Sequence, residues 1–286
     1  MGALTARNLK VFFRDHTAVV MSFFSDFIMI GLYALFLRDQ VTQGLDFPQA
    51  DNVVNAWIIS GIIAVTSMTA TLSGLGTMVE DRVSGIERDF LVSPLRRSSL
   101  TGAYAVSSFT IGAVLTLSTF VLGEIFIAAT GGEVLDAGHM LLAIAGVLLS
   151  VASSGAIVFF IASLLRSNSA YSMVSLVVGV LIGFLTGAYI PVGVLSEEMQ
   201  WIVKLFPAAY SASYFRFILT EEPIRAAMEG APASVAQDLR AELGVVYDFD
   251  GTHTTMATAV LVMIITAGVF FVLTWINFSI KKKSVA

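Results

Sequence analysis

The chain has 286 residues, of which 56% are hydrophobic and only 13% are charged, whereas about 25% of the residues of an ordinary soluble domain are charged. Together with a mean hydropathy of +0.84, this composition argues against a soluble protein. The formal net charge of −5 disfavours binding to nucleic acid, which requires basic side chains to neutralise phosphates. The absence of cysteine excludes disulfide bonds, thiolate metal sites and cysteine nucleophiles.

Six apolar segments are long enough to cross a bilayer core about 30 Å thick, which takes about 20 helical residues. They predict an all-α membrane protein with six transmembrane helices, in one domain over residues 1–286. Three basic residues precede the first segment, as in a signal peptide, but its length and the lack of a small-residue cleavage pattern favour a retained span. The predicted spans are residues 18–37, 53–78, 102–130, 140–165, 170–190 and 254–280.

The distribution of lysine and arginine predicts the orientation of the chain, because cytoplasmic loops are enriched in these residues. Eleven of the 16 basic residues lie on one side of the predicted membrane, in residues 1–16, 79–101 and 281–283 and at Arg166. We therefore expect a multi-pass protein with both termini in the cytoplasm. The long segment 191–253 is then on the outer side.

Residues 1–16 have the pattern of a helix with two distinct faces. Basic residues recur at helical spacing on one face, and apolar residues recur one position earlier: Arg7, Lys10 and Arg14, and Ala6, Leu9 and Phe13. Such a helix is predicted to lie along the inner headgroup layer. The alternative is that these basic residues are ordinary flanks of the first span.

The predicted inner loop, residues 79–101, contains a second helix signal. Ser84 and Glu87 have the spacing of a capping box, and Pro94 disfavours helix through the residue before it. A helix of about two turns over residues 84–93 is therefore predicted, with Ile86 and Phe90 on one apolar stripe that could dock another protein. Charged residues flank this stripe: Glu87, Arg88 and Asp89. A solvated charged loop is the alternative.

Two segments carry a family resemblance. Residues 80–95 combine acidic and basic residues with a Gly, Glu and Ser-Pro pattern, as in the first cytoplasmic loop of ABC-2 type ABC transporter permeases. The segment after the fifth span is similar to the outer re-entrant part of that family, in which a proline ends the span and two short helices dip back into the membrane. The residues that carry this similarity are Gly187, Ala188, Tyr189, Ile190, Pro191, Leu195, Trp201, Pro207, Tyr210 and Arg216. With six spans, the resemblance covers nearly the whole chain, although the acidic stretch 221–250 matches no family motif.

The resemblance implies a permease that exports its substrate, pairs with separate cytosolic ABC ATPase subunits, and forms a dimer with a second copy or a homologous permease. It also implies a location in the plasma membrane of a prokaryote. ATP and magnesium are then expected on the ATPase, with no cofactor on this chain. The sequence agrees, since only Lys283 is followed by Ser or Thr and the glycines of a P-loop do not precede it. The predicted coupling element consists of Ser84, Gly85, Ile86, Glu87, Arg88, Phe90 and Pro94.

Two acids lie within the predicted spans, Asp26 and Glu124. A charge at bilayer depth costs on the order of 2.5 to 3.5 kcal/mol, so such residues tend to serve function. If they face a hydrated cavity, they favour export of a hydrophobic, often cationic drug or antimicrobial over a lipid-linked polysaccharide. The alternative is that Asp26 bonds a neighbouring helix and that Glu124 reaches the outer interface.

Three glycines recur every fourth residue in the fifth predicted span: Gly179, Gly183 and Gly187. Small residues at this spacing let helices approach closely. We predict that they lie at or beside a dimer axis and border the substrate path. Packing within one subunit is the alternative.

Other functions remain open at this stage. A proton-coupled secondary transporter could use Asp26 and Glu124, but it would need an internal repeat or paired broken helices, and only one interrupted region is evident, near Pro191. Export of a polysaccharide or lipid and a non-transporting scaffold are further alternatives. A metal site is not predicted, because the three histidines lie on opposite sides of the membrane or in separate loops: His16, His139 and His253.

Overall fold

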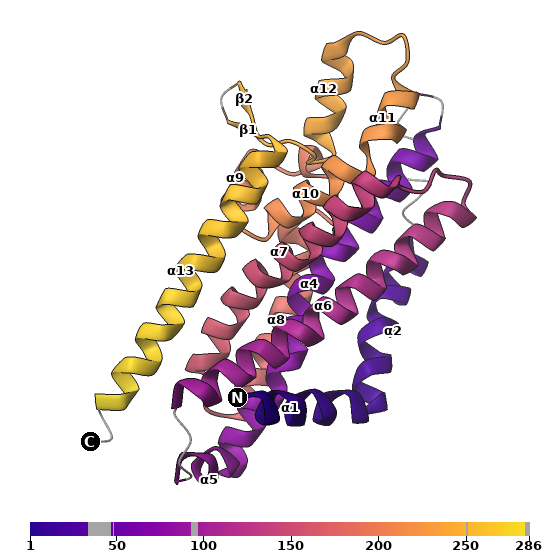
Figure 1. Ribbon diagram of the computed structural model, residues 1–286. Helices are drawn as coiled ribbons and strands as arrows, with labels where there is room; N and C mark the ends of the chain where they lie inside the picture. The colour runs from indigo at the N-terminus through magenta and orange to yellow at the C-terminus, as the bar shows by residue number, and fades with distance from the viewer. Residues whose placement is uncertain (34–46, 48, 93–96, 250, 284–286) are drawn as a thin grey trace.

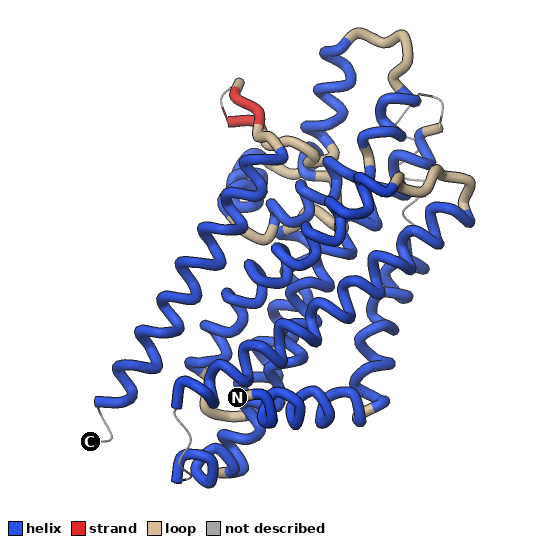
Figure 2. The backbone as a smooth tube through the Cα atoms, in the orientation of Figure 1, coloured by secondary structure: helices blue, strands red, loops and turns tan. Residues whose placement is uncertain are grey.

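The structure, a computed structural model, describes residues 1–33, 47, 49–92, 97–249 and 251–283. In these ranges the chain is mostly helical, with connecting loops and one small hairpin (Figure 2). The bundle helices are α1 (Gly2–Arg14), α2 (His16–Leu32), α4 (Ala50–Ser84), α5 (Ile86–Val92), α6 (Arg97–Ala129), α7 (Ala137–Leu164), α8 (Asn168–Leu185) and α13 (Met256–Lys283). Between α8 and α13 lie η2 (Val192–Val194), α9 (Glu197–Leu205), α10 (Ala209–Leu219), α11 (Glu221–Ala227), α12 (Ala233–Glu242), β1 (Asp248–Phe249) and β2 (Thr252–His253).

The prediction of an all-α membrane protein is confirmed. Five of the described helices are long and apolar enough to cross a membrane, namely α4, α6, α7, α8 and α13. They correspond to the second to sixth predicted spans. The first predicted span begins in α2, and its last residues, 34–37, lie outside the described residues, so the six-span layout stays a prediction.

Helix α4 occupies the centre of the bundle, in contact with α6, α7, α8 and α10 (Figure 1). The most apolar stretch of α4 is 94% buried, whereas that of α8 is 11% buried and that of α13 is 17% buried. A helix that is apolar on all sides belongs in the interior of a bundle. The outward faces of α8 and α13 are therefore left for lipid or for another chain.

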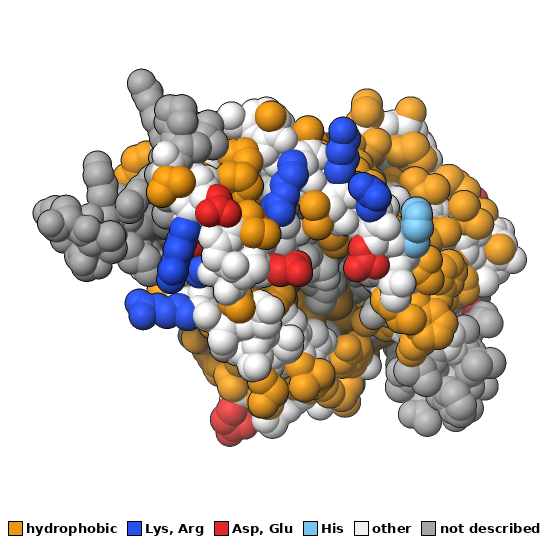
Figure 3. Space-filling view, turned by 90° about the horizontal axis from the view of Figure 1, so that it is seen from below, with side chains coloured by type: hydrophobic (Ala, Val, Ile, Leu, Met, Phe, Trp, Pro, Cys, Tyr) orange, Lys and Arg blue, Asp and Glu red, His pale blue; other side chains and the backbone are white. Residues whose placement is uncertain are grey.

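The two ends of the bundle differ. At one end, here called the α5 end, α1 lies across the bundle axis, α5 projects below the long helices, and α13 ends (Figure 1). Figure 3 views this end and shows Lys, Arg, Asp and Glu side chains gathered among apolar ones. The opposite end, here called the α12 end, carries α9 to α12 and the hairpin of β1 and β2. The helix predicted over residues 1–16 is present at the α5 end as α1.

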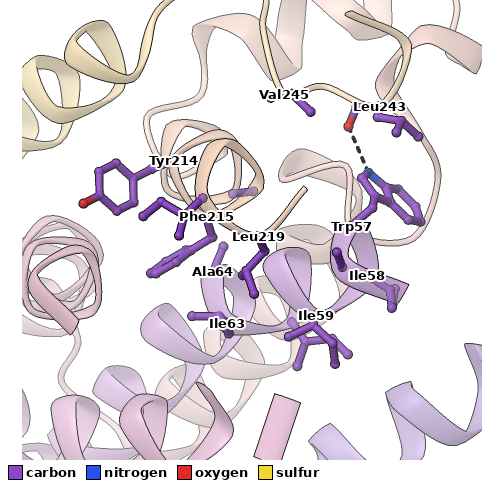
Figure 4. Close-up of a cluster of buried hydrophobic side chains, with 14 of the residues drawn as sticks. Trp57, Ile58, Ile59, Ile63, Ala64, Tyr214, Phe215, Leu219, Leu243 and Val245 are labelled. Atoms are coloured by element: carbon purple, nitrogen blue, oxygen red, sulfur yellow. Dashed lines mark hydrogen bonds between the residues drawn. The ribbon is translucent and has the colours of Figure 1, made fainter. Parts of the chain in front are cut away.

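The core of the α12 end forms where α4 meets α10 and the segment after α12 (Figure 4). Trp57 is 1% exposed, and its indole N–H donates to the carbonyl oxygen of Leu243 at 2.9 Å. Phe215 and Leu219 of α10 belong to the same buried cluster. This bond satisfies the one polar group of a large apolar side chain, and it fixes the segment after α12 to the central helix.

Two predicted boundaries are wrong. The long inner loop 79–101 is mostly helix, because α4 continues to Ser84 and α6 already begins at Arg97. The fifth span was predicted to reach residue 190, whereas α8 ends at Leu185. Hydropathy marks the apolar part of each helix, but it does not mark where a helix continues beyond the bilayer or stops within it.

The packing of Gly61 yields a testable prediction. A Cβ atom at this position of α4 would lie 2.7 Å from Cβ of Ala188 and 2.9 Å from its Cα. We expect Gly61→Ala to lower the free energy of unfolding by roughly 1–3 kcal/mol, because the added methyl group forces two backbones apart. The measurement is the midpoint of thermal unfolding in detergent. Gly268→Ala on α13 is the matched control, since nothing lies within 4 Å of its Cβ position, and an unchanged midpoint in both variants would contradict the packing described.

Candidate functional site

At the α5 end, α4 and α5 are separated by a single glycine. Gly85 has φ of 87°, a left-handed conformation that other residues rarely adopt. The hydroxyl of Ser84 donates to the carbonyl oxygen of Glu80 at 2.8 Å, so Ser84 is the last residue of α4. The predicted capping box is therefore wrong: Ser84 does not cap α5, and the short helix spans Ile86–Val92 instead of residues 84–93.

Arg82 joins three helices at this turn. Its Nε donates to Glu87 Oε2 at 3.2 Å, which ties α4 to α5. Its Nη1 donates to the carbonyl oxygen of Leu165 at 2.8 Å, which ties α4 to the end of α7. Glu87 therefore stabilises the angle between α4 and α5, a role other than the cap predicted for it.

Asp81 is the second connecting residue and is only 2% exposed. It accepts a hydrogen bond from Arg7 Nη2 at 2.9 Å and one from the hydroxyl of Tyr104 at 2.7 Å. The carboxylate favours the charged guanidinium and thereby raises the pKa of Arg7. The guanidinium carbon of Arg7 also lies 5.9 Å from the centre of the Phe90 ring. One buried carboxylate thus connects α1, α4 and α6, and Arg7 reaches on to α5.

These contacts define a junction at the α5 end, formed by Arg7, Asp81, Arg82, Glu87, Phe90 and Tyr104. Sequence reasoning found Glu87 and Phe90, placed Arg7 on the basic face of a helix along the headgroup layer, and missed the other three. Ile86 and Arg88 are exposed residues of α5. Pro94 lies outside the described residues.

A groove of about 690 Å³ runs along α4 between α2 and α8. Its polar side chains recur at helical spacing on one face of α4, at Thr66, Thr69, Ser73, Thr77 and Glu80. Gly179 of α8 lines the same groove, and nothing lies within 4 Å of its Cβ position. The groove leads from the level of α1 to the middle of the bundle, where Val65 and Tyr189 also line it.

The chain reversal after α8 lies at the inner end of this groove. Gly187 has φ of 63° and follows the end of α8, so the three glycines do not continue down one helix face as predicted. Instead, the amide of Ala188 donates to the carbonyl oxygen of Gly183 at 2.8 Å, and the Tyr189 ring covers Gly183. Gly187, four residues before Pro191, therefore directs the turn. Pro191 precedes η2.

Arg216 of α10 holds this reversal in place. It is fully buried, its Nη2 donates to the carbonyl oxygen of Gly187 at 2.7 Å, and its Nη1 donates to that of Gly244 at 3.3 Å. Its guanidinium carbon lies 5.5 Å from the centre of the Trp57 ring. Within the described part of the chain, no carboxylate lies within ion-pair distance of Arg216.

The other predicted re-entrant residues are only partly brought together. Tyr210 packs near this core, with its hydroxyl 2.9 Å from the carbonyl oxygen of Lys204. Trp201 is separate and 44% exposed on α9, where its ring centre lies 5.7 Å from that of Phe249. Pro207 lies in the short link between α9 and α10.

The two acids predicted to face a cavity are not shown to do so. Glu124 is buried near the α12 end of α6, and its Oε2 accepts from the amide of Leu135 at 3.1 Å. This geometry matches the alternative in which Glu124 reaches the loop region. Asp26 lies on α2, and its side chain is outside the described residues. No group of three or more His, Asp and Glu side chains able to hold a metal ion occurs among the residues that the structure describes.

A comparison with family models identifies the membrane domain. The model described as ABC-2 family transporter protein matches residues 19–276, which include all of α4 to α12 and most of α2 and α13. The chain belongs to the ABC-2 transporter family. No curated protein sequence matches it significantly.

Membership in the ABC-2 family confirms the resemblance inferred from residues 80–95 and 187–216. It makes this chain an integral membrane subunit of an ABC transporter, without a catalytic domain of its own within the matched region. The acidic stretch 221–250, which matched no motif, contributes α11, α12 and β1 to the α12 end.

The connection between Arg7 and Asp81 can be tested directly. We expect Asp81→Asn to loosen α1, because the charge that holds the guanidinium is removed while the side-chain shape is kept. The expected loss is roughly 1–3 kcal/mol of local stability, typical of hydrogen bonds to a charged group, and hydrogen exchange of the α1 amides should become faster. Asp89→Asn is the control, since Asp89 is an exposed residue of α5. Equal exchange in α1 of both variants would show that Asp81 does not fix α1.

Proposed function

We propose that this chain is the permease subunit of an ABC exporter, which moves hydrophobic or amphipathic, drug-like compounds with energy from a separate ATPase subunit. Membership in the ABC-2 family supports the permease role. The observation that carries the coupling role is the junction, in which the short helix α5 is bonded to α4 through Glu87 and Arg82. A displacement of α5 would then be transmitted to the long helices.

The proposed orientation places the α5 end in the cytoplasm of a prokaryotic cell, with both termini inside. The excess of basic residues at this end supports it, and Figure 3 shows them together at one face. Helix α5 would then project towards a cytosolic ATPase. Its exposed residues Ile86 and Arg88 are available for docking.

The junction suggests how α5 could act on the spans. Arg82 connects α5 to α4 and to the end of α7, while Asp81 connects α4 to α1 and α6. Charged hydrogen bonds of this kind are stronger and more directional than neutral ones. We therefore expect the five helices to respond together when the ATPase moves α5.

On the outer side, we propose that α9 and α10 form the re-entrant pair. The burial of α10 residues other than Phe217, in contact with α4, α7 and α13, supports this placement for α10. The reversal at Gly187, anchored by Arg216, would close the substrate path on that side.

We further propose that two permease chains associate through α8. Apolar side chains form an exposed stripe at helical spacing on this helix: Met173, Leu176, Val177, Val180, Leu181 and Phe184. Exposed apolar surfaces of this kind serve lipid contact or helix association in a membrane. Gly179 lies on the same helix beside the groove, so this association would place the groove near the dimer axis.

Coupling is tested with variants of the junction. We expect Phe90→Ala and Glu87→Gln to reduce substrate-stimulated ATP hydrolysis by the assembled transporter several-fold, with normal expression and membrane insertion. The measurement is ATP hydrolysis by the purified complex with its ATPase. Val134→Ala serves as control, because this exposed residue lies at the opposite end of the bundle. Unchanged stimulation in both junction variants would refute the coupling role of α5.

Association through α8 is tested by cross-linking, for which the absence of native cysteine is convenient. We expect Val177→Cys or Leu181→Cys to form a disulfide-linked dimer in membranes under mild oxidation. Val121→Cys is the control on the exposed face of α6. If Val121→Cys cross-links and both α8 variants stay monomeric, the interface lies elsewhere.

A further inference from the structure

Two hydroxyl groups of the polar stripe, those of Thr69 and Ser73, present hydrogen-bond acceptors to the groove. Thr69 donates its hydroxyl proton to the carbonyl oxygen of Val65 at 3.2 Å, and Ser73 donates to that of Thr69 at 3.0 Å. A hydroxyl has one proton and two lone pairs. With the proton used inside α4, each oxygen presents only its lone pairs to a ligand in the groove.

The charged groups that line the groove have one sign. Asp15 and Glu80, both exposed, lie at the α5 end, and the described residues that line the groove include no Lys, Arg or His. Arg7 of α1 is bound to Asp81. The mouth of the groove therefore attracts cations and repels anions.

The dimensions of the groove suit an amphipathic molecule. From Val65 to Glu80 the stripe extends about 22 Å at 1.5 Å per residue, and the volume of about 690 Å³ lies within the usual range for small-molecule sites. Apolar side chains face the stripe across the groove: Val11, Phe12, Met21, Ile28 and Met29. One side of a bound molecule would meet oxygen atoms, and the other would meet hydrocarbon.

We propose that this groove is a binding site for amphipathic substrates whose head group is an ammonium or other N–H-bearing cation. This proposal rests on the proposed exporter function and specifies its substrate class. The cation enters past Asp15 and Glu80, and its N–H groups then bond the oxygen atoms of Ser73 and Thr69. The hydrocarbon part of the substrate lies against α2. An anionic polysaccharide or lipid is disfavoured, because it would bring negative charge to acceptors and carboxylates.

The test uses a matched pair of fluorescent probes, dansylcadaverine and its N-acetyl derivative. They share chromophore and chain, but only the first carries an ammonium group. Binding to the purified permease in lipid nanodiscs is followed by dansyl fluorescence. We expect the wild-type chain to bind the ammonium probe about tenfold more tightly, as expected when hydrogen bonds to a charged group are added.

The variants are chosen to remove acceptors with little change in shape. Thr69→Val and Ser73→Ala should each weaken binding of the ammonium probe about threefold to tenfold and leave the acetylated probe unaffected. Thr110→Val and Ser118→Ala are matched controls, because these α6 hydroxyls make the same bond to a carbonyl four residues earlier and lie outside the groove. The proposal is overturned if the wild-type chain binds both probes equally, or if the two stripe variants bind the ammonium probe as tightly as the controls do.

Glu80→Gln provides an independent measurement at the mouth. We expect it to slow association of the ammonium probe and to weaken the dependence of association on salt, since a steering charge is lost. An unchanged association rate would contradict entry at this end. These binding measurements and the proposed exporter function can fail independently. Failure of the permease to purify with any ATPase would refute the exporter role whatever the probes show, whereas equal binding of both probes would refute only the substrate class.

Discussion

The burial of α4 is the constraint on which the other features depend. Because nearly all of this helix is enclosed by α6, α7, α8 and α10, its two ends and its polar stripe have fixed positions relative to the rest of the bundle. Asp81 and Arg82 are thereby presented at one end, and Gly61 and Trp57 are held against the reversal and α10 at the other. A close-packed interior of this kind transmits displacement with little compression.

Arg216, a buried arginine to which the described residues offer no carboxylate partner, imposes a second constraint. Transfer of a charge out of water is expensive unless its hydrogen-bond donors are satisfied. Arg216 meets this requirement at Nη1 and Nη2, which bond two main-chain carbonyl oxygens, and its guanidinium also lies on the face of Trp57, whereas its buried Nε has no hydrogen-bond partner among the described residues. A lysine could not reproduce the arrangement, because its single ammonium group lacks the planar fork that reaches two separate carbonyls. The reversal after α8, α10 and the segment after α12 are therefore bound to the same side chain.

The sequence predicted most of the helices because lipid imposes long apolar segments, and α4, α6, α7, α8 and α13 match them. It failed where a local signal competed with another. At Ser84 the capping pattern was outweighed by Gly85, whose left-handed conformation ends α4 one residue later. The spacing of Gly179, Gly183 and Gly187 predicted one continuous helix face, but Gly187 has a positive φ and lies beyond the end of α8.

The pairing of Arg7 with Asp81 joins residues 74 positions apart, and no local pattern reveals such a contact. The hydroxyl stripe of α4 was present in the sequence at a spacing of three and four residues, but only the structure shows that this face borders a groove.

The anchors made by Arg216 have one further property. Both of its hydrogen bonds are to main-chain oxygen atoms, at Gly187 and Gly244, and both of these residues have positive φ. Through these two bonds the arginine recognises the path of the backbone, and the side chain that it contacts is the Trp57 ring. The residues beside the two glycines, Ala188, Leu243 and Val245, are themselves buried, so an exchange there has to keep their volume as well as the shape of the turns. The α12 end is thus fixed to the bundle through main-chain oxygen atoms of two tightly packed turns.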